Sequence, residues 1–87
     1  LAQEDGSYLI DGMAVLRDIN RALRWDIPTT GPKTINGYVL EHLETLPDSN
    51  LCLQVDNYQI ETVQIKDNMI KALKIRQVEP VVDQSEQ

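Results

Sequence analysis

The chain has 87 residues, of which 14 are acidic and 8 are basic, so its formal charge is −6 at neutral pH. This excess of negative charge repels nucleic acid and anionic lipid, and it excludes nucleic-acid binding as a main function. A single cysteine, Cys52, excludes an internal disulfide and a cysteine-cluster metal site, and the length allows one small domain.

No apolar run approaches the roughly 20 residues of a membrane-spanning helix, so we expect no direct insertion of this chain into a membrane. The chain begins with leucine rather than methionine, and we expect it to be part of a longer protein. The polar residues 1–5 are expected to be frayed, and the acidic tail, residues 79–87, is expected to be disordered. The ordered domain should therefore occupy residues 6–78.

Residues 7–10 are predicted to form a short edge strand that ends at the pair Asp11-Gly12, where glycine can take a positive φ. The hydrophobic period then changes from two to that of a helix, which we expect over residues 14–24. The helix should stop before the loop Trp25-Asp26-Ile27-Pro28, because proline cannot continue a helix and restrains the residue before it. Its apolar side is formed by Val15, Leu16, Ile19, Ala22 and Leu23.

Thr34 is a suitable N-cap for a second amphipathic helix of about three turns, which should run up to Pro47. Its apolar residues recur at helical spacing and are Ile35, Tyr38, Val39, Leu43 and Leu46.

The segment from residue 51 to residue 78 is predicted to form three consecutive strands over residues 51–55, 58–65 and 69–78. In the last of them, Leu73 and Ile75 should point away from Lys74 and Arg76. Short turns join the strands, so neighbouring strands should be antiparallel. At the turns, Asn50 and Asn57 are expected to take positive φ.

The element order is therefore β-α-α-β-β-β, and it lacks the strict alternation of strands and helices that is typical of parallel sheets. The sequence predicts an α+β fold in which two helices pack on one face of a mostly antiparallel sheet.

Few residues suggest reaction chemistry. His42 lies between Glu41 and Glu44, but one imidazole with two helical carboxylates lacks the second strong ligand of a zinc site, so no metal site is predicted. Cys52 has no possible imidazole partner other than His42, and no serine lies in a nucleophile motif. We therefore expect that the chain is not an enzyme and has no catalytic residues.

Three arginines, Arg17, Arg21 and Arg24, form a basic stripe on the first helix, and Trp25 lies at the end of that stripe. Guanidinium groups pair with phosphate and an indole can stack on a base, so the stripe is a candidate site for a nucleotide or an acidic partner. The simpler interpretation is a solvated helix face whose cations lie near the helix C-terminus, where the helix dipole favours them.

The motifs together resemble the transporter-associated domain of the CorC/HlyC family over residues 6–78. They are Ser7-Tyr8-Leu9-Ile10-Asp11-Gly12, the helix from Leu16 to Leu23, Asp26-Ile27-Pro28, Thr34-Ile35-Asn36-Gly37, Leu46-Pro47, and Ile70 with Leu73 and Ile75. The chain departs from the family at Asn50 and Asn57, where glycine is usual, and at Thr62, where an apolar strand residue is usual.

The resemblance implies a C-terminal cytoplasmic module of an integral membrane protein that takes part in magnesium and cobalt efflux. The expected role is regulation or interaction, through the CBS domains and transmembrane domain of the same parent chain or through a homodimer. The family fold is also similar to part of an FAD-binding domain, so an alternative is a small-molecule sensor for FAD or an adenine nucleotide. A structural spacer is a third class.

Overall fold

The computed structural model describes residues 2–43, 45–46 and 48–78, and the expected acidic tail lies outside these residues. The strands are β1 (Tyr8–Asp11), β2 (Cys52–Val55), β3 (Tyr58–Lys66) and β4 (Met69–Gln77), and the helices are α1 (Leu16–Leu23) and α2 (Ile35–Leu40). The strands form one sheet in the order β1-β4-β3-β2, and each neighbouring pair is antiparallel. The predicted α+β fold and its element order are confirmed.

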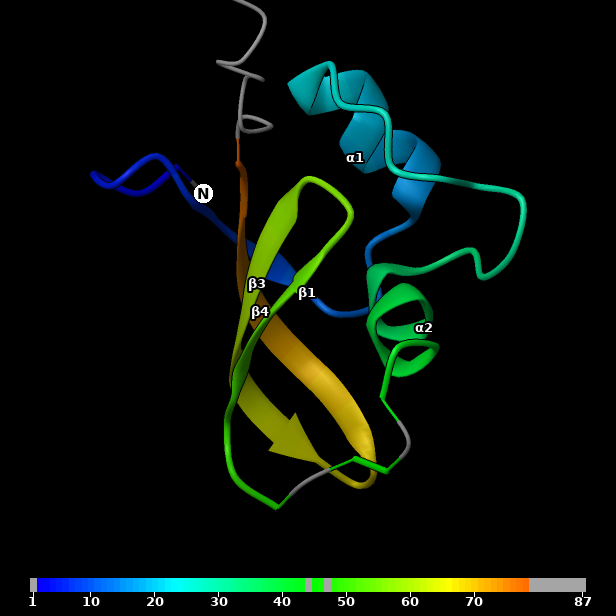
Figure 1. The fold of residues 1–87 in the computed structure, drawn as a ribbon, viewed down its shortest axis with the longest axis vertical. Helices are drawn as coiled ribbons and strands as arrows, with labels where there is room; N and C mark the ends of the chain where they lie inside the picture. Colours follow the sequence, from blue (N-terminus) through cyan, green and yellow to red (C-terminus); the bar gives the residue numbers. More distant parts are fainter. Residues whose placement is uncertain (1, 44, 47, 79–87) are drawn as a thin grey trace, which may run out of the picture.

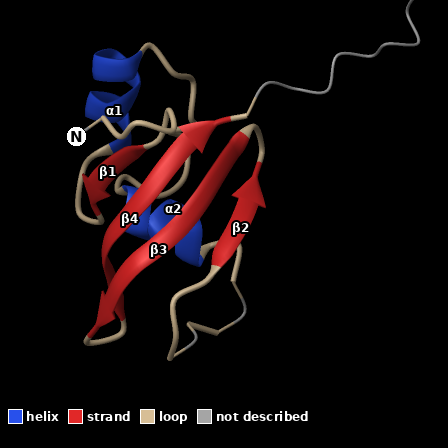
Figure 2. Ribbon diagram, turned by 90° about the vertical axis from the view of Figure 1, so that its left-hand side faces the viewer, coloured by secondary structure: helices blue, strands red, loops and turns tan. Residues whose placement is uncertain are grey.

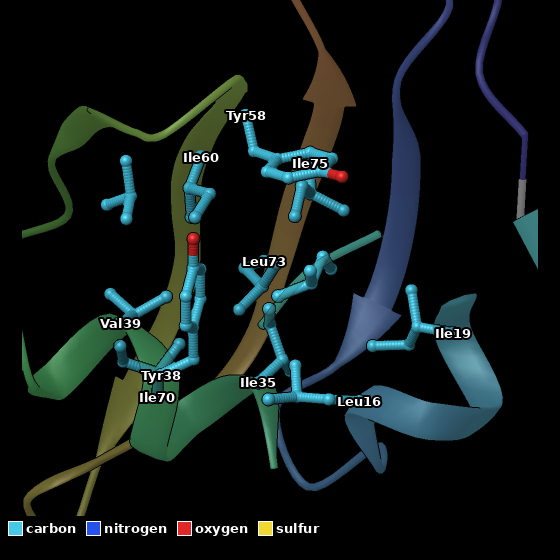
Figure 3. Packing of buried hydrophobic residues seen from close by; sticks show 12 residues of the cluster. Leu16, Ile19, Ile35, Tyr38, Val39, Tyr58, Ile60, Ile70, Leu73 and Ile75 are labelled. Atoms are coloured by element: carbon cyan, nitrogen blue, oxygen red, sulfur yellow. The ribbon is translucent and has the colours of Figure 1, made fainter. Parts of the chain in front are cut away.

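Both helices lie on the same side of the sheet (Figure 1), and the core fills the space between the two layers (Figure 3). The period of two in β4 places Leu73 and Ile75 in this core, and both side chains are fully buried. Burying an aliphatic side chain of this size contributes about 1.5–3 kcal/mol. The buried cluster is Leu16, Ile19, Ile27, Ile35, Tyr38, Val39, Val55, Tyr58, Ile60, Ile70, Leu73 and Ile75.

The helix α1 is shorter than predicted, because its ends are fixed by backbone contacts. The amide of Leu16 donates to the carbonyl of Lys33 at 2.8 Å, which ties the start of α1 to the segment before α2. At the other end, Arg24 takes the left-handed conformation with φ 59° and donates its amide to Asn20 O. The Asn20 side chain then holds the following loop by accepting from the Ile27 amide and donating to the Ile27 carbonyl.

The prediction of about three helical turns after Thr34 is wrong, because α2 ends at Leu40. The predicted N-cap is confirmed, since the Thr34 hydroxyl accepts from the Gly37 amide at 3.2 Å. After Leu40, the amide of His42 donates to Val39 O, three residues back. The His42 ring nitrogen Nδ1 forms a hydrogen bond with Tyr38 O at 2.9 Å. In a continuing α-helix this carbonyl would instead accept a hydrogen bond from the His42 amide.

Asn36 connects α2 to the sheet and to the end of β1. Its side-chain Oδ1 accepts a hydrogen bond from the buried Ile70 amide at 2.8 Å, beside the irregular register of β3 and β4. Its own amide donates to Gly12 O at 2.8 Å. A Cβ atom on Gly12 would lie 1.8 Å from Ile70 O, so residue 12 must be glycine because of this close approach. The expected positive φ at Gly12 is absent, since Gly6 is the one described glycine with positive φ.

In the turns that join β2, β3 and β4, the residues with positive φ differ from those predicted. Positive φ occurs at Asp56 before β3, and at Asp67 and Asn68 before β4, so the predictions for Asn50 and Asn57 are wrong. A two-residue hairpin turn can require positive φ at its first central position alone, and Asp56 occupies that position. The Asn50 side chain instead donates to Val63 O at 3.0 Å, where β3 bulges.

Thr62 is buried in β3, yet its hydroxyl has hydrogen-bond partners. The hydroxyl accepts from the Leu51 amide at 2.8 Å, and the Thr62 amide donates to Leu51 O at 2.9 Å. Thr62 therefore holds Leu51, the residue just before β2, against β3. Because its hydroxyl is hydrogen-bonded, burying it does not incur the free-energy penalty of an unsatisfied polar group.

Tyr38 extends the connection between α2 and the sheet. It is 2% exposed, and its hydroxyl donates to Asp56 Oδ2 at 2.5 Å, in the turn between β2 and β3. Burial, followed by the hydrogen bond to the Asp56 carboxylate, raises the pKa of Tyr38 well above its ordinary value.

Replacing Asn36 with alanine should lower the free energy of unfolding by about 1–3 kcal/mol, because the buried Ile70 amide loses its acceptor. Urea unfolding of N36A and of the matched control N57A measures this difference. Asn57 is exposed, so N57A should stay within about 0.5 kcal/mol of the wild type. Equal stabilities of N36A and N57A would contradict the role of Asn36.

The raised pKa of Tyr38 predicts a loss of stability at alkaline pH. In the unfolded chain the phenol ionises near pH 10, whereas the folded state retains the proton, so the free energy of unfolding should fall as pH rises above about 10. Urea unfolding at several values between about pH 8 and 11 should show a smaller decline for Tyr38→Phe than for the wild type. Tyr8→Phe serves as the control and should keep the wild-type decline; a Y38F profile parallel to the wild type would refute the assignment.

Candidate interaction surface

The helices leave one face of the sheet uncovered, and Figure 2 looks onto this face. A row of side chains crosses all four strands on it, because the register places Leu9 beside Lys74, Lys74 beside Glu61, and Glu61 beside Cys52. A second row places Arg76 beside Gln59 and Gln59 beside Gln54. We call this surface, formed by Leu9, Cys52, Gln54, Gln59, Glu61, Lys74 and Arg76, the open sheet face.

Hydrogen bonds order one half of the open sheet face. Arg76 donates from Nε to Gln59 Oε1 at 2.9 Å, and Gln59 donates from Nε2 to Cys52 Sγ at 3.8 Å. The guanidinium of Arg76 is therefore held over β3 while its terminal nitrogens remain available to a partner. This arrangement suits a charged or hydrogen-bonding contact.

The open sheet face contains a hollow of about 410 Å³, which lies between the N-terminal turn and strands β2 to β4. Two cations and two carboxylates line the hollow, together with the polar groups of Ser7, Cys52 and Gln59; the charged residues are Asp5, Glu61, Lys74 and Arg76. Within the described part of the chain, the sole ion pair joins Arg21 to Asp18, elsewhere on the surface. The charges around the hollow are therefore close together without being paired.

Asp5 is the most strongly held of these charges. Its Oδ1 accepts from the hydroxyl of Ser7 at 2.6 Å and from the Ser7 amide at 3.0 Å. These bonds, with a smaller contribution from the positive charge of Lys74, hold the pKa of Asp5 below its ordinary value. The carboxylate therefore remains ionised at neutral pH and is a fixed negative group at the rim.

The predicted arginine stripe is divided by the structure. Arg21 is exposed and lies 3.8 Å from Asp18, where solvent screens the attraction. Arg24 is the residue that ends α1, where the backbone is left-handed, whereas Arg17 lies on the first turn of α1. Arg17 lines a cleft of about 380 Å³ with Val15, Leu16, Thr29, Thr30, Gly31 and Lys33, and Arg21 and Arg24 are not part of that cleft. The stripe as a ligand site stays a prediction.

Trp25 has a packing role in the structure. Its ring lies between Tyr8, at 5.7 Å between ring centres, and Tyr58, at 5.2 Å. The Tyr58 hydroxyl also accepts from the Asp26 amide at 3.1 Å. The indole is thus enclosed by aromatic neighbours that join α1 to the sheet.

His42 is exposed, and its ring is bonded to Tyr38 O and lies 5.4 Å from the Tyr38 ring. A carbonyl accepts a hydrogen bond, so Nδ1 must carry the proton in this contact. Across the described residues, no three side chains of His, Cys, Asp or Glu are grouped as a metal site. Cys52 is exposed on β2, and its neighbours are polar side chains of β3.

The sequence contained the signal for the open sheet face, because Lys74 and Arg76 alternate with the buried Leu73 and Ile75 in β4. It did not indicate which face of β3 and β2 would join them. That information lies in the register, which places Glu61 and Gln59 opposite the two cations.

None of the helices in the described residues has the length and apolar character that a bilayer crossing requires. The chain is 43% identical over 75 residues to the UPF0053 protein of Haemophilus influenzae, covering 86% of this chain and 18% of that protein. It is 40% identical over 79 residues to the UPF0053 inner membrane protein YfjD of Escherichia coli, covering 91% of this chain and 18% of that protein. The chain thus spans about a fifth of the length of these relatives.

Solved structures share the fold. A conserved protein of unknown function from Haemophilus influenzae superposes with a TM-score of 0.83 at 41% identity, covering 90% of this chain and 96% of that chain. The transporter-associated domain of a CBS domain protein from Porphyromonas gingivalis gives a TM-score of 0.77 at 25% identity, covering 91% of this chain and 97% of that chain. The family model CorC_HlyC, described as the transporter associated domain, matches residues 2–79. The chain therefore belongs to the CorC_HlyC family of transporter-associated domains.

Proposed function

We propose that this chain is the C-terminal, cytoplasmic regulatory and interaction domain of an integral membrane protein that exports magnesium or cobalt. The observation that carries the proposal is the open sheet face, a broad polar surface on a domain whose family occurs in CBS-domain proteins. The surface would bind the CBS domains or transmembrane domain of the same parent chain, or a second protomer.

The family context supports a membrane-bound parent. One relative is the inner membrane protein YfjD, and another relative is the same kind of domain in a CBS domain protein. Efflux of magnesium or cobalt and the cytoplasmic location are what the family resemblance implies. These properties belong to the proposal for the whole parent.

The composition of the open sheet face suits a reversible contact. It has unpaired charges of both signs around the hollow, and a complementary partner surface would pair them. A docked domain changes transport when it binds one conformation of the transporter better than the other, because only differential binding shifts a conformational equilibrium. Mixed charge gives specificity for one partner orientation without the strong apolar burial of an obligate interface.

The proposal includes no catalytic step. The exposed Cys52 has glutamine as its hydrogen-bonding neighbour, and the ring of His42 is bonded to a carbonyl. The alternative function, a sensor for FAD or an adenine nucleotide, would use the cleft beside Arg17, whose volume of about 380 Å³ is near the lower end for ligand pockets. The packing of Trp25 between two tyrosines disfavours its use as a stacking platform.

Reversing one charge on the open sheet face should impair the parent protein. In cells that lack the parent gene, a parent carrying Arg76→Glu should restore growth in high magnesium or cobalt less well than the wild type. The matched control is Arg21→Glu, an equal charge change at another exposed arginine, on α1. If docking is weakened about tenfold, the corresponding free-energy change is about 1.4 kcal/mol.

Growth and oligomer size of both variants indistinguishable from the wild type would argue against docking through the open sheet face. Loss of function in R21E with normal function in R76E would indicate that the partner binds the arginine stripe and not the open sheet face. Circular dichroism of the isolated variants should confirm that both remain folded.

A further inference from the structure

The N-terminal segment of the chain already lies along the outer edge of the sheet, beside β1. Ala2 forms an antiparallel bridge with Tyr8, and the Gln3 amide donates to Ser7 O at 2.7 Å. In Figure 2 this end of the chain lies at the outer side of β1, away from β4. The segment therefore runs antiparallel to β1 on the side that no other strand of the described sheet occupies.

The chain reverses direction between this segment and β1 through a hairpin turn stabilised by hydrogen bonds. The Gly6 amide donates to Gln3 O at 3.2 Å, and Gly6 takes φ 87°, as in a three-residue loop with glycine in the left-handed position. The Asp5 carboxylate closes the turn by accepting from the amide and the hydroxyl of Ser7. Frayed motion of residues 1–5 in solution stays a prediction, but the turn fixes the direction in which the chain approaches β1.

An apolar groove lies beside this edge. It has a volume of about 240 Å³ between β1 and α1, and it is lined by Tyr8, Ile10, Asp18, Ile19, Ala22 and Leu23. Ala22 is exposed at its rim. Five of the six lining residues are apolar or aromatic, so the groove favours an apolar side chain.

The register determines which residue would reach the groove. The bridge between Ala2 and Tyr8 places the residue two positions before Ala2 opposite Ile10, with its side chain on the groove side of the sheet. The residue three positions before Ala2 lies opposite Asp11. The backbone of Gly12 faces β4, because its amide donates to Lys71 O, so the Asp11 amide faces the outer edge where this residue would pair.

We propose that in the parent protein the residues preceding this chain form a fifth strand on β1 and insert an apolar side chain into the groove. The occupant is the parent chain itself, since relatives about five times longer contain this domain and the N-terminal segment already approaches in the correct register. The inference rests on the proposed function only in assuming such a parent. It requires no metal transport, so its test is separate.

The test compares residues 1–87 with a domain that starts about six residues earlier in the parent gene. Isolated domains are suitable, because a solved relative consists almost entirely of this domain. By NMR, the Asp11 amide should exchange with solvent about tenfold more slowly in the longer domain, and the melting temperature should rise by about 4–8 °C. The side chain two positions before Ala2 should show nuclear Overhauser contacts to Ile10 and Leu23.

Ala22→Lys provides the groove-side control, since it places a long charged side chain at the rim. It should remove the gain of the longer domain, whereas Arg21→Lys, on the neighbouring position outside the groove, should leave the gain unchanged. Unchanged Asp11 exchange and melting temperature in the longer domain would overturn the proposal. Protection of Asp11 in residues 1–87 that rises with protein concentration would also overturn it, because a second copy would then be the occupant.

Discussion

The arrangement of the two layers depends on the hydrogen bond between the Asn36 side chain and the Ile70 amide. It lies where β4 changes register against β3, so the sheet itself supplies no regular partner for that amide. The same residue binds Gly12 O through its own amide, and Gly12 crosses β4 so closely that it has no room for a side chain. One polar residue thus places α2, the end of β1 and the bulge of β4 relative to one another.

The Asn36 contact places α2 on one face of the sheet, and α1 lies on the same face because its first residue, Leu16, donates its amide to Lys33 O. The opposite face is left to side chains whose positions follow from the strand register. The burial of Leu73 and Ile75 directs the alternating side chains of Lys74 and Arg76 to the opposite face of β4. The residues of the polar surface are therefore placed by the packing of the core and by the strand register. A surface of this kind is suited to binding another domain, and this is the physical basis of the proposed regulatory role in a membrane-bound parent.

The periodic parts of the sequence predicted the fold well. Alternation in the last three strands and helical spacing around Leu16 and Ile19 depend on burial, which residue type reports directly. The errors lie where side chains bind the backbone. The His42 ring forms a hydrogen bond with Tyr38 O and the helix stops early, while Asn20, Asn36 and Asn50 satisfy backbone groups that lie 7, 34 and 13 residues further along the chain. Such contacts have no periodic signature, and the open sheet face needed the register of strands 51–78 before its residues could be grouped.

The central claim, that the open sheet face is covered in the parent protein, is tested most directly by the reactivity of Cys52. This thiol is exposed on that face in the isolated domain, so it should react readily with a maleimide. In the intact parent, quantified by mass spectrometry of the peptide that contains Cys52, the rate should fall at least about tenfold, while a cysteine substituted for Arg21 keeps its rate. Equal rates for Cys52 in the isolated domain and in the parent would contradict the claim.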